Sequence, residues 1–231
     1  MLPGAWKGLL SFVLAEAGLE LVPKEIWRRP AVAADARRRG KEPAEMLLDR
    51  SFHHSAMASL RDAEKRGRPD LVHATLLSVT GTPLYLDGRV KVWIHTSAGI
   101  AVEIAEKTRV PKSYIRFRGL MEEALAGVTE GGLVRARAMG MKELARGLRP
   151  GRVFGLSVLG RQGSAEGLAA EVAAMKAPAV VVGGFPRGHF SGTTMAVIDE
   201  LVRIHPRPLE AHVVAARVVY EVEKAEARFK D

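Results

Sequence analysis

The chain has 231 residues, enough to bury a full core as one domain or at most two. Its 47% apolar and 26% charged residues are ordinary for a soluble globular protein. The sequence contains no run of about 18 apolar residues that could form a membrane span. The absence of cysteine excludes disulfides and thiolate metal sites. The 35 Lys and Arg residues outnumber the 26 Asp and Glu residues, and the net charge of +9 favours a polyanionic partner, most simply a nucleic acid.

The first half of the chain mixes helices with a few strands. The N-terminal stretch reaches Glu16 early and lacks a small-residue cleavage site, so it predicts a core strand at 9–14 and no signal peptide. Periodicity, proline positions and turn dipeptides then predict helices at 30–39, 51–61 and 69–79, hairpin strands within 84–104, and a helix at 116–126.

The second half alternates strand, helix and strand. The pattern predicts a strand at 152–160, a helix starting at the N-cap Ser164, and a strand in "PAVVVGG" at 178–184. Such alternation is typical of a parallel sheet with crossover helices. The last helix, at 209–229, has an apolar stripe (Val213, Val214, Ala216, Val218) that is wider than one sheet face needs, which favours packing against a second copy.

The loop "GGFPRGHF" (183–190) follows a strand, where open α/β sheets bind ligands. It lacks the Lys-Ser/Thr pair of a phosphate-binding P-loop, and its glycines do not have dinucleotide-fold spacing. With Gly160 and the loop at 203–212, it predicts strand-end loops around a compact ligand without phosphate, such as S-adenosylmethionine. Ordinary turn glycines remain the alternative.

His53 and His54 are the obvious candidates for a metal site. Adjacent helical residues point about 100° apart, which is poor ligand geometry, and no H-E-x-x-H motif occurs. We therefore expect no metal, and a structural role for His53 with Asp49 as its partner.

Five segments of the chain occur in the order of a known family. They are "LLDRSFHHSAM" (47–57), "RGRPDLVHATLL" (66–77), "VWIHT" (92–96), "TRVPKSYIRFRGLMEE" (108–123) and "VVVGGFPRGHF" (180–190). Together they strongly resemble the pseudouridine N1-methyltransferases of small-subunit ribosome biogenesis, of the SPOUT superfamily of knotted methyltransferases. The resemblance covers nearly the whole chain.

The resemblance implies an α/β fold with a parallel sheet and a deep C-terminal trefoil knot, in one domain over 1–231. Within it we expect a family-specific extension at roughly 80–115 and a knotted cofactor-binding half at roughly 150–231. The implied protein is a cytoplasmic homodimer that uses S-adenosylmethionine to methylate N1 of a pseudouridine in small-subunit ribosomal RNA; contacts with ribosomal proteins or assembly factors stay open. The implied cofactor-binding residues are Leu159, Gly160, Gly183, Gly184, Phe185, Pro186, Gly188, Ile204 and Leu209.

The same resemblance assigns RNA contacts and catalysis. Arg68, Arg109, Lys112 and Arg116 match the family's RNA-contacting basic positions, although Lys112 replaces the more usual arginine and loses its bidentate geometry. Asp70, with Arg68, is the catalytic candidate. It is either the base or orienter of the pseudouridine, or an acid at the start of a helix that pairs with Arg68.

Two aromatic residues lie among these basic positions. Tyr114 and Phe117 are candidates for stacking on bases, and for Phe117 the core is favoured.

Two rival functions remain. A non-catalytic ribosome-assembly factor would share the basic charge, but it would not need Gly160, Gly183 and Gly188 together. A nucleotide-dependent oxidoreductase or a metal hydrolase would need a phosphate loop or a ligand cluster, and the sequence offers neither.

Overall fold

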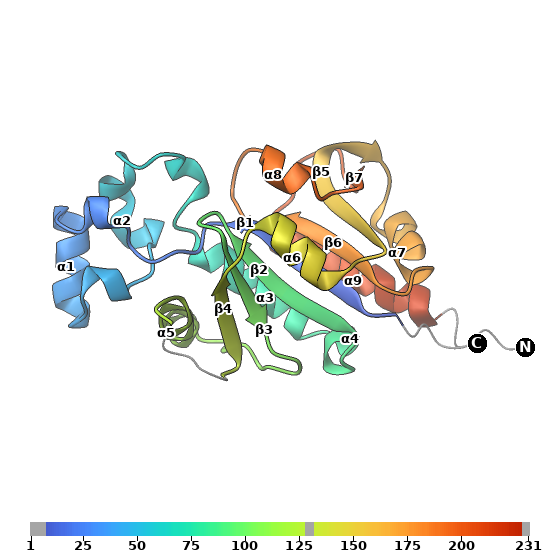
Figure 1. Ribbon diagram of the computed structural model, residues 1–231, viewed down its shortest axis with the longest axis horizontal. Helices are drawn as coiled ribbons and strands as arrows, with labels where there is room; N and C mark the ends of the chain where they lie inside the picture. The colour runs from blue at the N-terminus through green and yellow to red at the C-terminus, as the bar shows by residue number, and fades with distance from the viewer. Residues whose placement is uncertain (1–7, 128–131, 228–231) are drawn as a thin grey trace, which may run out of the picture.

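A seven-stranded sheet runs through the computed structural model, which describes residues 8–127 and 132–227 (Figure 1). The strand order is β4-β3-β2-β1-β6-β5-β7. The strands are β1 (Leu10–Ala17), β2 (Val90–Thr96), β3 (Ile100–Ile104), β4 (Val134–Ala138), β5 (Arg152–Gln162), β6 (Pro178–Gly183) and β7 (Glu200–Arg203).

Most of the sheet is parallel. Strand β1 lies between β2 and β6, strand β5 joins β6 to β7, and all four of these pairings are parallel. Strands β3 and β4 extend the sheet by antiparallel pairing beyond β2. The predicted α/β class is confirmed, with a mixed sheet dominated by parallel strands.

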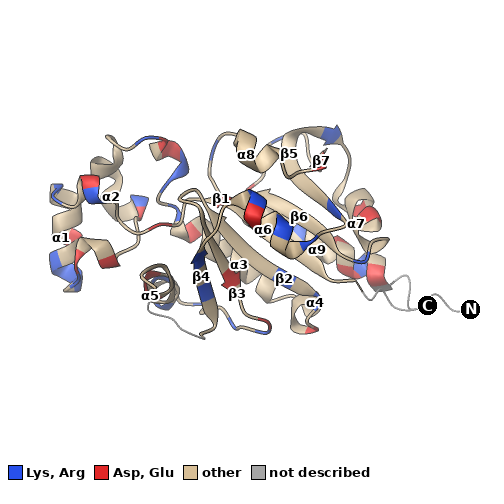
Figure 2. Cartoon of the chain, in the orientation of Figure 1, with Lys and Arg blue, Asp and Glu red and all other residues tan. Residues whose placement is uncertain are grey.

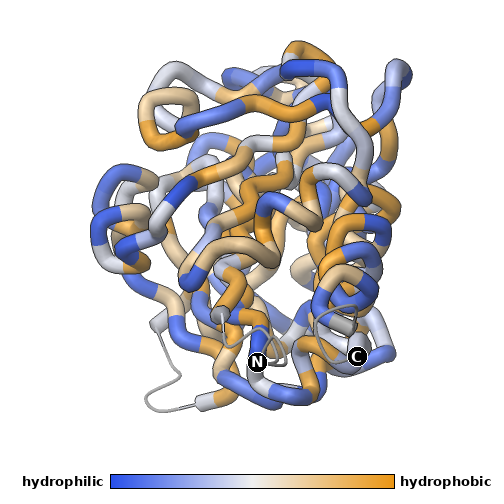
Figure 3. The backbone as a smooth tube through the Cα atoms, turned by 90° about the vertical axis from the view of Figure 1, so that its right-hand side faces the viewer, coloured by the Kyte–Doolittle hydropathy of each residue, from blue (hydrophilic) through white to orange (hydrophobic). Residues whose placement is uncertain are grey.

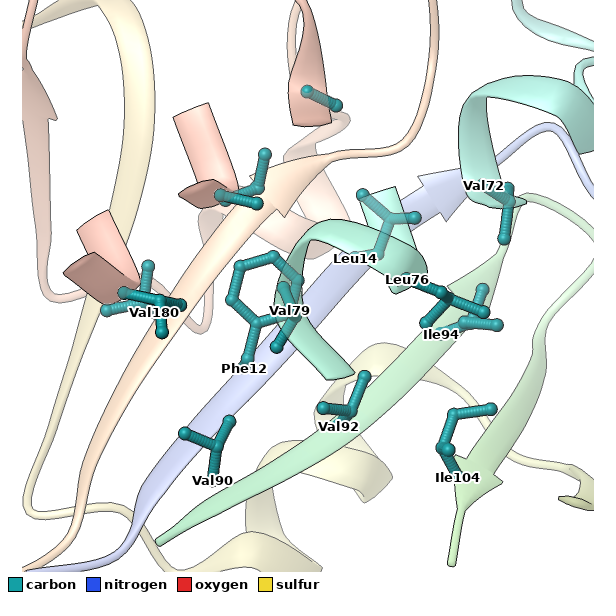
Figure 4. Close-up of a cluster of buried hydrophobic side chains, with 14 of the residues drawn as sticks. Phe12, Leu14, Val72, Leu76, Val79, Val90, Val92, Ile94, Ile104 and Val180 are labelled. Carbon is teal, nitrogen blue, oxygen red and sulfur yellow. The ribbon is translucent and has the colours of Figure 1, made fainter. Parts of the chain in front are cut away.

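Helices cover both faces of the sheet. On one face, α9 packs between α3 and α7, and their apolar side chains meet those of the strands, such as Phe12, Val92 and Val180 (Figure 4). On the other face, Met141 and Leu144 of α6 pack on β1 and its neighbours. In Figure 3, the segments inside the molecule are accordingly coloured mainly orange, for hydrophobic residues. The helices are α1 (Pro30–Arg39), α2 (Arg50–Met57), α3 (Pro69–Thr80), α4 (Pro83–Leu86), α5 (Tyr114–Leu125), α6 (Met141–Leu148), α7 (Ala165–Ala173), α8 (Gly192–Met195) and α9 (Ala211–Ala227), with short 3-10 helices at Lys24–Ile26, Pro43–Glu45 and Ala63–Lys65.

Helices α1 and α2 belong to a small lobe beside the sheet, at the left of Figure 1. Its core is separate from that of the sheet and consists of Val22, Ile26, Val32, Ala36, Met46, Leu48, Ala56, Met57 and Leu60. The extension expected at roughly 80–115 instead contains β2 and β3, which are integral strands of the main sheet. The part of the chain with its own core is thus residues 22–60.

Several predicted elements match closely, and two predictions were wrong in part. The helix expected at 51–61 ends at Met57, and Asp62 has a left-handed φ of 53° that no helix continues through. The hairpin strands expected within 84–104 are confirmed as β2 and β3, but the first residues of that range, which were not expected to be helical, belong to α4. A helix forms first, because Thr82 caps the amide of Tyr85 and Pro83 fits the first helical position.

The last helix begins at Ala211, and the predicted end at Phe229 lies outside the described residues. Its apolar stripe is largely used within the chain. Val214 and Val218 are buried against the sheet and neighbouring helices, whereas Ala216 is exposed. The expectation that this stripe exceeds what one chain needs was therefore wrong for Val214 and Val218.

Candidate active site

A cavity of about 620 Å³ lies where β5, β6 and β7 end and α9 begins. Its volume is within the range of small-molecule sites. Apolar side chains dominate the lining near the strands, and charged residues come from the loops. The lining residues used below are Leu156, Ser157, Val158, Gly183, Phe185, Pro186, Arg187, Gly188, Arg203, Ile204, Arg207, Leu209 and Glu210.

Glycine is required for steric reasons at two positions of the loop 183–190 that line the cavity. A Cβ atom added to Gly183 would lie 2.9 Å from Cζ of Phe185, so the glycine leaves room for this ring beside the cavity. Gly188 has a φ of +95°, which side-chain-bearing residues rarely adopt. Gly184 instead faces the core, because its added Cβ would lie 2.7 Å from Cα of Ala17.

Strand β5 leaves its ladder next to the cavity. Leu156 and Arg161 both lie opposite Val202 of β7, so residues 157–160 form a bulge between them. Ser157 and Val158 of this bulge line the cavity. Gly160 packs on the β7 backbone, since its added Cβ would lie 2.5 Å from the carbonyl carbon of Leu201.

The cavity therefore gathers six of the nine predicted cofactor residues: Gly183, Phe185, Pro186, Gly188, Ile204 and Leu209. Within the described residues, Leu159, Gly160 and Gly184 lie outside the lining.

Arg68 and Asp70 form a bidentate pair at the start of α3. Nε and Nη2 of Arg68 donate to the two carboxylate oxygens of Asp70, at 2.8 and 2.9 Å. Burial alone would raise the pKa of Asp70, but the hydrogen bonds and charge of Arg68 outweigh it, so the pKa lies below its usual value. The backbone amide of Arg68 donates to Gly18 at the end of β1, which anchors the pair beside the sheet.

Glu210 is an acidic residue of the cavity lining whose charge acts on Arg68. It is one of the lining residues, at the start of α9. The pKa of Arg68 is raised mainly by its hydrogen bond to Asp70, and the nearby charge of Glu210 adds to the shift. The backbone joins the two regions, because the amide of Gly18 donates to Gly184 at the start of the cavity loop and its carbonyl accepts from Arg68. The sequence prediction missed Glu210, although its place in a strand-end loop was a usable signal.

The other basic candidates form an exposed group after β3. Arg109, Lys112 and Arg116 are all exposed to solvent. Their loop is fixed from beneath, since His73 Nε2 lies 2.7 Å from the Pro111 carbonyl oxygen. Arg109 and Lys112 in this loop and Arg116 in the first turn of α5 therefore lie on one continuous, exposed segment.

The sequence of this chain matches the model of a known protein family. The model of the EMG1/NEP1 methyltransferase family matches residues 12–223. The chain belongs to this family.

Relatives and solved structures of the family agree along most of the chain. The ribosomal RNA small subunit methyltransferase Nep1 of Pyrobaculum neutrophilum is 43% identical, over 91% of this chain and 96% of its own. The protein of the same name from Staphylothermus marinus is 36% identical, over 93% and 95%. The crystal structure of Archaeoglobus fulgidus Nep1 bound to S-adenosylhomocysteine has a TM-score of 0.83 and 36% identity, and covers 95% of this chain and 99% of that one.

The aromatic residues of the family segment at 108–123 are used inside the protein. Phe117 is fully buried and stacks on His73, with ring centroids 4.4 Å apart, which confirms the prediction of a core position. The Tyr114 hydroxyl donates to Asp49, and burial together with this carboxylate raises the pKa of Tyr114. The ring of Phe117 is therefore not available for stacking on a base.

His53 is fully buried in the lobe and has the predicted partner. Its Nδ1 accepts from the Asp49 amide at 3.1 Å, and its Nε2 lies 3.3 Å from Asp35 Oδ2. Burial lowers the pKa of His53, although Asp35 opposes the shift. Across residues 8–127 and 132–227, no three His, Asp or Glu side chains are grouped so that they could hold a metal ion. None of the helices described is long and apolar enough to span a membrane.

Proposed function

We propose that this chain transfers a methyl group from S-adenosylmethionine to N1 of a pseudouridine in small-subunit ribosomal RNA, as part of small-subunit biogenesis in the cytoplasm. The observation that carries the proposal is that the loop lining a cavity of suitable size is joined to the Arg68–Asp70 pair through the backbone of Gly18, which accepts from the Arg68 amide and donates to Gly184. Family membership and the printed names of the relatives supply the reaction and the class of RNA.

The residues of the cavity fit the methyl donor. Gly183, Phe185 and Gly188 would hold it on one side, and Ile204 and Leu209 on the other. The loop has no phosphate-binding motif, which suits a ligand without phosphate. When bound, S-adenosylmethionine supplies a methyl group on a positively charged sulfonium. The lining contains Glu210 together with Arg187, Arg203 and Arg207, which suits a ligand that carries both a cationic group and a carboxylate.

The reaction would form a bond between N1 of pseudouridine and the methyl carbon, break the bond from that carbon to sulfur with S-adenosylhomocysteine as the leaving group, and pass the N1 proton to water. The protein must align the base and stabilise the negative charge that develops on its ring. In this proposal the Arg68 guanidinium supplies that charge stabilisation. Because the pKa of Asp70 is lowered, its carboxylate is a weak base, and we assign it to holding the Arg68 fork in position.

RNA binding falls to the exposed cations. Arg109, Lys112 and Arg116 would contact phosphates on the approach to Arg68, and Lys112 would act as a point charge. Basic residues are also seen on β4 and, mixed with acids, on α1 in Figure 2. Their spread agrees with a polyanionic partner that has a large footprint.

We also propose a homodimer and a C-terminal trefoil knot. Exposed apolar side chains at Tyr220 on α9 (57% exposed) and Leu159 (65%) support a self-association surface. The double approach of β5 to Val202 supports an unusual chain path in the C-terminal half. Light scattering at twice the 25.0 kDa chain mass tests the dimer, and an experimental chain trace over 150–227 tests the knot.

Methylation of defined RNA tests the proposed reaction. An RNA stem-loop with pseudouridine in its loop is incubated with the protein and S-adenosylmethionine, and the same RNA with uridine is the control. Mass spectrometry should find one added methyl group on the pseudouridine RNA only. Binding of RNA without methyl transfer would favour the assembly-factor alternative, and preferential binding of ATP or NAD would overturn the assignment of the cavity.

A further inference from the structure

The loop that lines the cavity is tied to two charged residues from the N-terminal half of the chain, Glu16 and Lys65. In Figure 1 the turn after α2 lies beside the loop that leads to α8. Nζ of Lys65 donates to the carbonyl oxygen of His189 at 2.6 Å and lies 4.5 Å from the centre of the Phe185 ring. Lys65, which follows the lobe in the chain, thus contacts both the backbone and an aromatic side chain of the cavity loop.

Glu16 holds the far end of the same loop. Its Oε1 accepts from the Ser191 amide at 2.6 Å, and its Oε2 lies 3.4 Å from Nζ of Lys65. Burial by itself would raise the pKa of Glu16, but hydrogen bonds from Thr194 and Ser191 outweigh it and lower the pKa, so the carboxylate is charged at neutral pH.

The backbone around Glu16 shows that this arrangement is built in. Glu16 has a left-handed φ of 52°, which is strained for a residue with a side chain and persists only where its surroundings fix it. Two residues on, the amide of Gly18 donates to Gly184, and its carbonyl accepts from Arg68. Glu16 to Gly18 therefore joins the cavity loop to the Arg68 segment.

The fit leaves little freedom. A Cβ atom added to Gly188 would lie 3.0 Å from Cε of Lys65, so the loop passes directly against the lysine stem. The side chain of Lys65 is 23% exposed and that of Glu16 is 9% exposed, so both charges are partly shielded from water. Charge-assisted hydrogen bonds of this kind are stronger than those between neutral groups.

From these contacts we propose that Glu16 and Lys65 are positioning residues for the methyl donor, which fix the loop 185–191 in its binding conformation. The inference rests on the proposed function, because the ligand of the cavity is taken to be the methyl donor. Elsewhere the loop is held by the edge-on contact of Phe185 with Phe190 and by the packing of Phe190 on the core, and it is exposed at Arg187, Gly188 and His189. Without the clamp, the loop would sample conformations in which Phe185 no longer lines the cavity.

The test is the affinity for S-adenosylhomocysteine, measured by calorimetry with the full chain. Lys65→Met keeps the length of the side chain and removes its charge, and should raise Kd by about tenfold or more. Lys65→Arg should retain most of the affinity, since it can still donate to His189 and pair with Glu16. Arg61→Met is the matched control, because Arg61 lies in the same segment and its side chain is 94% exposed.

Separate KM values for the methyl donor and for RNA distinguish a positioning role from a general loss of structure. Lys65→Met should raise KM for the methyl donor and leave KM for RNA unchanged, with a melting temperature near that of Lys65→Arg. Glu16→Gly relieves the strained backbone but removes the carboxylate, so it should also lose donor affinity even where it melts no earlier than wild type.

Two results would overturn the inference. One is a Kd for Lys65→Met within twofold of wild type. The other, should Lys65→Met fail to fold, is wild-type affinity in Glu16→Gln and Glu16→Gly. If wild type itself does not bind S-adenosylhomocysteine, the proposed function fails, and that outcome is distinct from either of these.

Discussion

Replacing Asp70 with asparagine keeps the shape of the side chain and removes its charge. The stability cost should be small, because the Asp70 side chain is 51% exposed. An exposed ion pair contributes about 0.2–1 kcal/mol, and an acid in the first turn of a helix about 0.3–1 kcal/mol. We expect a loss of about 1 kcal/mol, which lowers the melting temperature by roughly 2–4 °C for a chain of this size.

The catalytic cost should be much larger than the stability cost. Asparagine can accept only one of the two hydrogen bonds that now fix the Arg68 fork, at 2.8 and 2.9 Å. Misplacement of a group by about 1 Å can cost about 10²-fold in rate, so single-turnover methylation should slow by about 10- to 100-fold. RNA affinity should change less than twofold, because the positive charge of Arg68 remains.

The pH profile separates positioning from proton transfer. Since the pKa of Asp70 is lowered, its titration falls below the range of the assay, and the variant and wild type should have rate profiles of the same shape between pH 5 and 8. If Asp70 were the proton acceptor, the loss would reach roughly 10² to 10⁴. Asp62→Asn is the control, since Asp62 also pairs with a nearby arginine, Arg61 at 3.5 Å, but in a more exposed setting. A folded Asp70→Asn protein with the wild-type rate would refute the assignment.

Three other predictions follow from the same structure. Arg109→Ala and Arg116→Ala should each weaken RNA binding and reduce the slope of log affinity against log salt by roughly one unit or less, as measured by filter binding across salt concentrations. Gly183→Ala should weaken S-adenosylhomocysteine binding by about tenfold in calorimetry, because its Cβ would lie 2.9 Å from Cζ of Phe185 and displace the ring. The pKa of His53 is lowered by burial, so below about pH 6.5 the unfolded chain binds more protons than the folded one. The free energy of unfolding should therefore fall as the pH drops below this value and stay level above it. Urea unfolding between pH 5 and 8 measures this dependence.

Each of these has a control in the chain. Lys142→Ala on α6 should leave RNA affinity and its salt slope unchanged, and equal effects at Lys142 and Arg109 would point to net charge alone. Gly147→Ala, where an added Cβ meets nothing within 4 Å, should leave ligand binding intact. His53→Asn should reduce the acid slope, and the part that remains comes from His95, whose pKa is also lowered by burial. The exposed His54→Asn should keep the full slope; identical slopes in both would contradict the role given to His53.

Local sequence signals were enough to predict the α/β class and the positions of many elements. Helix α1 falls at its predicted bounds, since Pro30 fixes the first turn and Gly40, at φ 61°, ends the helix. The Ser164 cap and the buried strand β6 were found in the same way. These signals act over a few residues, so they can be recognised before the chain is folded. Segment order and motifs also indicated the family.

Strand β4, helix α6 and strand β7 were not predicted. The residues of β4 alternate between charged and small, and β7 has only four residues, so neither carries a strong apolar pattern. Their strand state comes from pairing with β3 and β5. Cross-strand pairing is a tertiary property, and no local signal stands in for it.

The tertiary structure decided which of the candidate residues meet. It places Gly183 and Leu209 in one cavity and sets Gly160 against the β7 backbone, although both glycines end strands in the sequence. It also joins Lys65 to His189, which are 124 residues apart in the chain. A glycine serves a ligand or a close backbone contact equally well, and a lysine pairs with any acceptor in reach. Only the packing of the sheet, lobe and loops selects among these partners.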